Sequence, residues 1–332
     1  MIKLIMALLY FNMSCQINIG NIQFNTANAV EINQSIQELS DKAKIILPRN
    51  ARRLLIDGVE RTLEKRNITD YIKVGDPVKI QLGYDGENYT EFEGYVTRLS
   101  SDIPIEIECE DEMYKLKKTT FNTTLKDATL LDLLKLIAPG YTYEVIDDIK
   151  LGKFIIENAS AYEALEALRN DYLMHSYFKG KTLVVGFPSS FAPQEKLVYN
   201  LKHLASKKEL EFVKKEDVKL QIKAISNNSD GSKKVVTVGE TGGSVRTLNF
   251  MNKSESDLKK LAESNLNSLS FDGWQGSIKA IGRPSPKAGY SCELVDDEYT
   301  ERTGVYLIEG VTKLFNGSDG YKNVIKLSLK IS

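Results

Sequence analysis

The feature that most constrains this fold is an ordered set of β-strand phrases that occurs twice in the chain. In the first third, GDPVKIQL leads through YTEF and EGYVTRL to IPIEIE. In the last third, YSCEL leads through YTERTGVYLI and EGVTKL to KNVIKLSLKI. The shared Glu-Gly phrase is Glu93-Gly94 in the first set and Glu309-Gly310 in the second, although the two hairpins differ in length. An internal repeat of this kind predicts two related β-barrel-like domains with equivalent Glu-Gly strands.

The first set contains a clear hairpin signal. Val78, Ile80 and Leu82 alternate with polar residues, which predicts a strand with one buried face. Asp85-Gly86 follows, and glycine accepts the positive φ that a tight turn requires. We therefore predict two antiparallel strands joined at this turn.

A second alternating stretch, IPIEIECED, places three carboxylates on the face opposite its apolar residues: Glu106, Glu108 and Glu110. Alternate residues of a strand lie about 6.5 to 7 Å apart, which makes a stripe. A hard cation such as calcium needs a cage of oxygen ligands instead. The sequence therefore predicts an acidic face that is directed to solvent.

The residues between the two sets have a mixed helical and strand character. TLLDLLKLIAPG and SAYEALEALRNDYL have helical spacing, and Ser160 is suited to cap the second helix. Short strand candidates lie between these helices, and a hairpin follows them. PSSFAPQ, residues 188–194, fits neither period and is predicted to be a linker. This pattern predicts a small α+β domain.

After the linker the pattern returns to strands. Glu211–Ser226 is a strand candidate, and a single helix follows later, capped by Ser254 or Ser256. The predicted fold is therefore mainly β with an α+β insert. We predict three domains: 1–122, a first β-barrel-like domain; 123–190, the small α+β domain; and 191–332, a β-rich region with one helix that contains the second barrel-like domain.

Composition and motifs argue against several function classes. The 332 residues carry a net charge of -1, whereas a general nucleic-acid or membrane-surface binder needs a basic excess. Three separated cysteines and two histidines favour neither a disulfide framework nor a metal site. Neither GxSxG, HExxH nor a phosphate-binding glycine loop occurs. We therefore predict a protein that is not an enzyme and has no cofactor; a glycan-processing enzyme is a weaker alternative.

The N-terminal stretch MIKLIMALLYFNMSC has two interpretations. It resembles a short signal peptide, with Cys15 as a lipid-attachment site, and this favours a secreted or lipid-anchored β-domain adhesion protein. Alternatively, residues 8–19 form a first strand and translation starts at Met6. Asn12 interrupts the apolar run, which favours the strand. No apolar run reaches the roughly 20 residues of a membrane-spanning helix, so membrane insertion is not predicted.

The order of these phrases resembles the tail hub proteins of contractile-tailed phages, the late control protein family, whose relatives occur in bacterial secretion spikes. The resemblance covers nearly the whole chain. It is one of pattern and order, carried by INIGNIQF, ELSDKAKIILPRN, VGDPVKIQLGYDG, EGYVTRLSSD, FDGWQGSIKAIGRPSPKAG and GYKNVIKLSL.

The resemblance implies a structural role in the baseplate of a phage or phage-tail-like particle. Three copies would form a ring whose six similar barrels adapt a sixfold tail tube to a threefold spike. The implied partners are a homotrimer of self and the tube and spike subunits, with DNA passing transiently and without specific binding. The implied location is the virion tail, assembled in the bacterial cytoplasm. An acidic stripe that faced the lumen would repel DNA phosphates.

Overall fold

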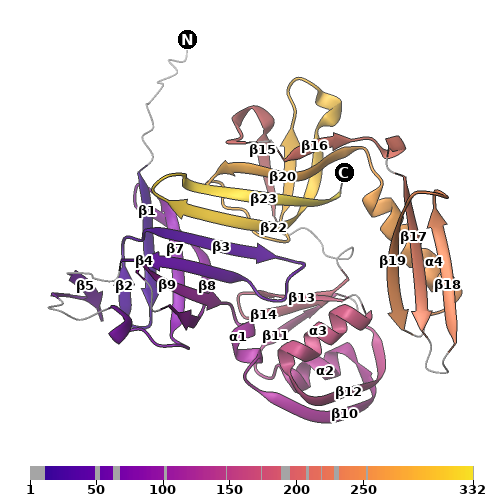
Figure 1. The fold of residues 1–332 in the computed structure, drawn as a ribbon, viewed down its shortest axis with the longest axis horizontal. Coiled ribbons are helices and arrows are strands. Elements are labelled where there is room, and N and C mark those ends of the chain that lie inside the picture. Colours follow the sequence, from indigo (N-terminus) through magenta and orange to yellow (C-terminus); the bar gives the residue numbers. More distant parts are fainter. Residues whose placement is uncertain are drawn as a thin grey trace. The chain divides into compact units, whose positions relative to one another are not determined.

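The structure is a computed structural model that describes residues 12–48, 53–62, 68–100, 103–146, 148–172, 174–187, 195–206, 209–217, 219–227, 232–251 and 253–331. Strands dominate it, with four α-helices among these residues (Figure 1). The described residues form two compact units that interleave along the chain. Unit 1 comprises the described parts of Met1–Ile32, Lys42–Glu110 and Lys313–Lys322, and unit 2 comprises Asn33–Asp41, Asp111–Thr312 and Asn323–Ser332.

Unit 1 is a β structure with strand order β3-β4-β9-β8-β7-β1-β2-β5-β6. Its elements are β1 (Met13–Ile19), β2 (Ile22–Phe24), β3 (Ala29–Ser35, shared with unit 2), β4 (Lys42–Leu47), β5 (Arg53–Ile56), β6 (Val59–Thr62), η1 (Ile68–Asp70), β7 (Pro77–Tyr84), β8 (Glu87–Leu99) and β9 (Ile105–Glu110). Ile17 lies opposite Ile80, and both are fully buried, because alternate residues point into one core. The predicted hairpin is confirmed as β7 and β8, with Asp85 and Gly86 at positive φ.

A hairpin from the end of the chain completes the core of unit 1. It is made by β22 (Gly304–Asn316) and β23 (Gly320–Lys330), whose tip, Lys313–Lys322, belongs to unit 1. Phe315 and Tyr321 join the apolar core that the N-terminal strands build. The tip is therefore part of the N-terminal fold although it comes from the last strands of the chain.

A buried ion pair fixes this tip. The Lys313 ammonium binds the Glu91 carboxylate on β8, and neither side chain has any exposed surface. Tyr84 adds a hydrogen bond, since its hydroxyl donates to the Tyr321 carbonyl at 2.6 Å. Because an unpaired charge is costly in a protein interior, each member of the pair depends on the other.

The α+β part of unit 2 surrounds one apolar core, which includes Leu133 and Leu165. Its elements are α1 (Met113–Leu116), β10 (Thr120–Thr129), α2 (Leu130–Ile137), β11 (Thr142–Val145), β12 (Lys150–Ser160), α3 (Ala161–Tyr172), β13 (His175–Lys179) and β14 (Thr182–Gly186). β10 pairs with β12, and β11-β14-β13 forms a separate sheet. Ser160 caps α3 as predicted, because its hydroxyl accepts the Glu163 amide at 3.2 Å.

The rest of unit 2 contains a second β structure with its own core. Its elements are β15 (Lys196–Asn200), η3 (Leu201–His203), β16 (Leu210–Val213), η4 (Lys215–Asp217), β20 (Gly273–Ile281), β21 (Ser291–Val295) and η5 (Thr300–Arg302), with the unit 2 parts of β22 and β23. The strand order is β16-β20-β23-β22, and β21 pairs with both β22 and β15. The core includes Cys292, Tyr306 and Ile325.

A smaller module lies between β16 and β20 in the sequence. It consists of β17 (Leu220–Asn227), β18 (Lys233–Gly239), β19 (Ser244–Met251) and α4 (Glu255–Leu269), with strand order β18-β17-β19. Leu258 and Ala262 of α4 pack on the sheet, and Ser254 caps the helix as one of its two predicted caps. Figure 1 shows α4 running alongside these strands.

The structure confirms the predicted fold class, but it differs from the prediction in some details. The fold is mainly β with an α+β part, as predicted. The single strand predicted over 211–226 is instead two strands separated by η4, because Asp272 accepts the Lys215 amide at 2.8 Å and fixes the break. Residues 8–11 of the predicted first strand and the linker 188–194 lie outside the described residues. The boundaries between the three predicted domains stay predictions.

Candidate functional site

The acidic stripe of β9 lies on the face opposite the core, since Ile105, Ile107 and Cys109 are buried. Neighbouring strands supply cations to two of its three carboxylates. Lys44 Nζ on β4 lies 2.8 Å from Glu106, and Arg98 Nη1 on β8 lies 3.1 Å from Glu108. Glu110 is opposite Lys42 in the strand register.

These contacts change the electrostatics of the stripe. The hydrogen bond from Lys44 to Glu106 raises the pKa of Lys44, so the Lys44 ammonium stays charged near neutral pH. Alternating cations and anions across adjacent strands offset much of the negative field that the carboxylates would produce alone. The face is a polar ladder with no cage of oxygens among the described residues, and its direction toward a lumen stays a prediction.

The two Glu-Gly phrases each lie on the second strand of a hairpin. Glu93 and Gly94 are on β8, and Glu309 and Gly310 are on β22. In both places the glycine lies against the backbone of a neighbouring strand. A Cβ at Gly94 would lie 2.2 Å from the Glu110 carbonyl oxygen, and one at Gly310 would lie 3.1 Å from a carbonyl oxygen of β3. A side chain would therefore be crowded by the neighbouring backbone at either position, which explains the glycine in each phrase.

The cross-strand registers of the two hairpins are not identical. On β7 and β8, Lys79 lies opposite Glu93 and forms an ion pair with it at 3.0 Å. When Leu82 is aligned with Leu294, the counterpart of Lys79 is Ser291, which lies opposite Leu307 and not opposite Glu309. The phrase is therefore displaced by two residues in the second hairpin. The duplication stays a prediction.

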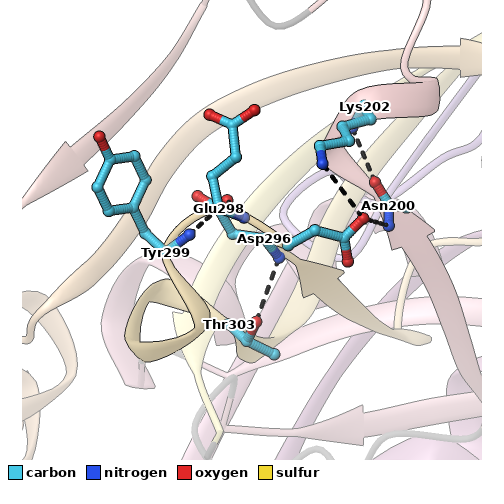
Figure 2. A network of polar contacts seen from close by, with 7 residues as sticks. Asn200, Lys202, Asp296, Glu298, Tyr299 and Thr303 are labelled. Atoms are coloured by element: carbon cyan, nitrogen blue, oxygen red, sulfur yellow. Dashed lines mark hydrogen bonds and ion pairs between the residues drawn. The ribbon is translucent and has the colours of Figure 1, made fainter.

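The acidic VDDE segment forms the tip between β21 and β22. The Asp296 carboxylate accepts the amides of Glu298 and Tyr299 at 3.0 and 3.1 Å, and the Asp296 amide donates to Thr303 Oγ1 (Figure 2). Asp297 binds the Asn200 amide at 2.9 Å and lies 3.8 Å from Lys202 Nζ. These carboxylates stabilise a turn. Across the part of the chain that the structure describes, no group of three or more acidic, histidine or cysteine side chains is placed to hold a metal ion.

Trp274 on β20 is a packing residue. Its side chain is largely buried, and its ring meets Phe212 of β16 edge-on at 5.1 Å. Its indole Nε1–H donates to the Arg302 carbonyl at 3.0 Å, which ties the η5 turn to β20. Tyr299 and Arg302 were not predicted from the sequence as residues of interest. Their only signal there is an arginine three residues after a tyrosine in an otherwise acidic turn.

The nucleophilic and titratable groups of the interior are not activated for chemistry. Burial raises the pKa of Cys15 to about 11 and that of Cys109 and Cys292 to about 12, so these thiols are protonated at neutral pH. Burial lowers the pKa of His175, whose Nδ1 contacts the Ile36 carbonyl at 3.2 Å. Burial, and next the charge of Asp41, raise the pKa of Asp111 well above its usual value. Within the described residues, none of these groups forms a recognisable catalytic arrangement with another.

None of the helices in the described part of the chain is long and apolar enough to cross a bilayer.

Comparison with known proteins gives a result only at the level of structure. No family model matches the chain, and no curated protein has a significantly similar sequence. The tail protein of Neisseria meningitidis MC58 matches with a TM-score of 0.63 and 16% identity, covering 96% of this chain and 96% of that chain. The 43 kDa tail protein of prophage MuSo2 from Shewanella oneidensis matches with a TM-score of 0.60 and 15% identity, covering 95% and 98%.

A secretion-system protein has the same fold. The c3393 protein of E. coli, a type VI secretion system component with structural similarity to the phage T4 tail proteins gp27 and gp5, matches with a TM-score of 0.59 and 10% identity. The match covers 96% of this chain and 76% of that chain. The resemblance to tail hub proteins is therefore confirmed at the level of structure: this chain has the fold of phage and prophage tail proteins.

Proposed function

We propose that this protein is a structural hub subunit of a phage tail or a phage-tail-like particle. The observation that carries the proposal is the extent of the structural match, which includes nearly all of this chain and nearly all of two phage or prophage tail proteins. A match that was confined to one barrel would support only a common β-domain. Coverage in both directions favours the same arrangement of elements, and we assign the same type of structural role by analogy with that fold.

The proposed assembly is a homotrimeric ring that joins the tail tube to the spike. Each copy contributes two β structures, one built around β7 and β8 and the other around β21 and β22. Three copies would therefore present six similar units, which is the number that a sixfold tube requires at its interface with a threefold spike. The repeated order of strand phrases supports this part of the proposal.

The proposed role is not enzymatic. The described interior holds protonated thiols and a desolvated histidine, and the acidic turn at Asp296 uses its carboxylates within the protein. The proposed partners are further copies of this chain and the tube and spike subunits. DNA would pass through without specific binding, and the ladder on β9, with cations beside its carboxylates, would not hold phosphates strongly. The proposed location is the virion tail, after assembly in the bacterial cytoplasm.

Measurement of molar mass in solution, followed by negative-stain imaging, tests the ring. We expect a particle of three chains with a central hole at high protein concentration. The addition of cognate tube and spike subunits should stabilise that particle and place it between them. A chain that stays monomeric at high concentration and in the presence of both neighbours would contradict the proposal.

A further inference from the structure

The turn between β22 and β23 carries the only Asn-Gly dipeptide of the sequence, Asn316-Gly317. Oδ1 of the Asn316 side chain accepts hydrogen bonds from the Ser318 amide at 3.0 Å, the Ser318 hydroxyl at 2.8 Å and the Asp319 amide at 2.7 Å. Asparagine often hydrogen-bonds the backbone two residues later in this way. The turn therefore holds the side-chain carbonyl of Asn316 in place, with donors around its oxygen.

Gly317 supplies a backbone nitrogen next to this carbonyl. A Cβ built at Gly317 would have no atom within 4 Å apart from its chain neighbours, and Gly317 and Ser318 are exposed, so water reaches the turn. Because glycine has no side chain, its nitrogen is open to the Asn316 Cγ. In the part of the chain that the structure describes, Asn316 Nδ2 makes no hydrogen bond that would retain it as a leaving group.

We propose that Asn316-Gly317 is a self-modification site, at which the native chain converts asparagine to isoaspartate with water as the co-reactant. The Gly317 nitrogen loses its proton to a base in the solvent and attacks Asn316 Cγ. The new C–N bond closes a succinimide ring, the bond from Cγ to Nδ2 breaks, and ammonia leaves. Water then opens the ring at one of its two carbonyls, which gives isoaspartate or aspartate.

The hydrogen bonds to Oδ1 favour this reaction because negative charge develops on that oxygen. Attack at Cγ turns Asn316 Oδ1 into an oxyanion, and donors that already point at such an oxygen lower the barrier. The same hydrogen bonds keep the side chain folded over the residues that follow it, so the reacting groups are held close together. The reaction therefore needs no catalytic group from elsewhere in the chain.

Asn200 provides an internal comparison, because it has a similar side-chain turn. Its Oδ1 accepts the Lys202 amide at 2.9 Å. The next residue is Leu201, whose buried side chain hinders attack by its nitrogen, and Nδ2 of Asn200 is held by Asp297 at 2.9 Å. We therefore expect Asn200 to stay unmodified.

A modification at this turn would affect the fold of unit 1. Phe315 and Tyr321 flank the turn and belong to the apolar core of unit 1. Isoaspartate adds a methylene group to the main chain and a carboxylate to the turn, so the hydrogen bonds around Oδ1 are lost. Conversion should therefore loosen the tip and destabilise unit 1, which gives the completed unit a chemical lifetime.

The test is incubation of the full chain under native conditions at pH 8, followed by peptide mapping with mass spectrometry. The change from amide to carboxyl is detected by mass, and isoaspartate is distinguished from aspartate by enzymatic methylation of its carboxylate. In wild type, Asn316 should convert while Asn200 stays intact. The rate should rise with pH, because the Gly317 nitrogen must lose a proton. Amide hydrogen exchange of β7 and β8 should be faster in the modified fraction than in the unmodified one.

Two variants separate the effect of the turn from that of the dipeptide. Ser318→Ala removes one donor to Oδ1 and should slow conversion about threefold or more, which is less than the factor of about 10²–10³ that one such donor contributes in a closed active site. Gly317→Ala keeps all the donors and should slow conversion further, because its Cβ crowds the attacking nitrogen. The open space around Gly317 makes this variant a mild one for folding.

Two outcomes would overturn the inference. If Asn316 stays intact in the native chain while the urea-unfolded chain converts it, the turn protects the dipeptide. If a Ser318→Ala chain with an unchanged unfolding midpoint converts as fast as wild type, the donors around Oδ1 have no role in the reaction. Both results leave the proposed ring untouched, because neither experiment measures association.

Discussion

The buried pair between Lys313 and Glu91 allows a quantitative prediction. Both side chains are completely buried, so solvent screens neither charge, and removal of one partner leaves the other charged in an apolar interior. Loss of one member of such a pair costs about 3–5 kcal/mol. Lys313→Met or Glu91→Gln should therefore lower the free energy of unfolding of unit 1 by that amount, which is a large part of the total stability of a typical domain, about 5–15 kcal/mol.

Urea denaturation measures this loss. With a slope of about 2 kcal/mol per molar of urea, the midpoint for unit 1 should fall by about 1.5–2.5 M. Amide hydrogen exchange of β7 and β8 follows unit 1, whereas Trp274 fluorescence follows unit 2 and should shift less. Two separated transitions in the variants would show that the loss is confined to unit 1.

Two further variants decide whether the ionic character is the cause. The double variant Glu91→Leu with Lys313→Met removes both charges and should recover most of the loss, because an apolar pair of similar volume is often neutral or stabilising. Lys44→Met is the matched control, since Lys44 and Glu106 are 42% and 39% exposed, and it should cost much less than either single variant. The reasoning would be refuted by single variants that lose no more than this control, or by a double variant that loses the sum of the two singles.

Three other predictions concern the interior. The pKa of Asp111 is higher in the folded protein than in the unfolded chain, so between these two pKa values the native state holds a proton that the unfolded state has lost. The contribution of Asp111 to stability is therefore present at low pH and is lost as pH rises through the folded pKa. Asp111→Asn should therefore gain stability relative to wild type as pH rises, in urea melts at several pH values, and a difference that is constant with pH would contradict this. Gly94→Ala should cost about 1–3 kcal/mol because its Cβ would meet the Glu110 carbonyl, whereas Gly317→Ala, with open space around it, should cost much less in the same assay. A thiol reagent at pH 8 should leave Cys15, Cys109 and Cys292 unmodified in the native protein and should modify them after unfolding, because all three thiols are buried. Rapid labelling of the native protein would contradict this prediction.

Features that depend on near neighbours in the sequence could be predicted. The turn at Asp85-Gly86 needs only a residue that tolerates positive φ, and the cap at Ser160 needs only an amide three residues later. The apolar stripe of α4 follows from the helical period. In each case the energetic reason lies within a few residues, so the amino-acid pattern records it directly.

Features that depend on distant partners could not be predicted. Lys313 has the pattern of an exposed residue in EGVTKL, and it is buried only because Glu91, 222 residues away in the sequence, neutralises it. The strand β10 has no clear signal in the sequence, because register shifts along it, with Asp127 at positive φ, move its side chains between faces and disrupt the alternation. The Arg302 guanidinium contacts the Phe212 ring, and Trp274 packs on the same ring. These residues come from η5, β16 and β20, which only the folded chain brings together.

The hairpin tip that completes unit 1 has a consequence for synthesis of the chain. Residues Lys313–Lys322 leave the ribosome more than two hundred residues after β8, so the N-terminal unit waits through translation of the entire middle region without part of its core. During that interval Glu91 has no buried partner and β3 lacks its neighbour β22. A chain that is cut short before Lys313 would therefore carry an incomplete N-terminal unit, open to proteolysis. Only a chain that has been translated through this tip can complete unit 1, which is a form of length control exerted by the fold.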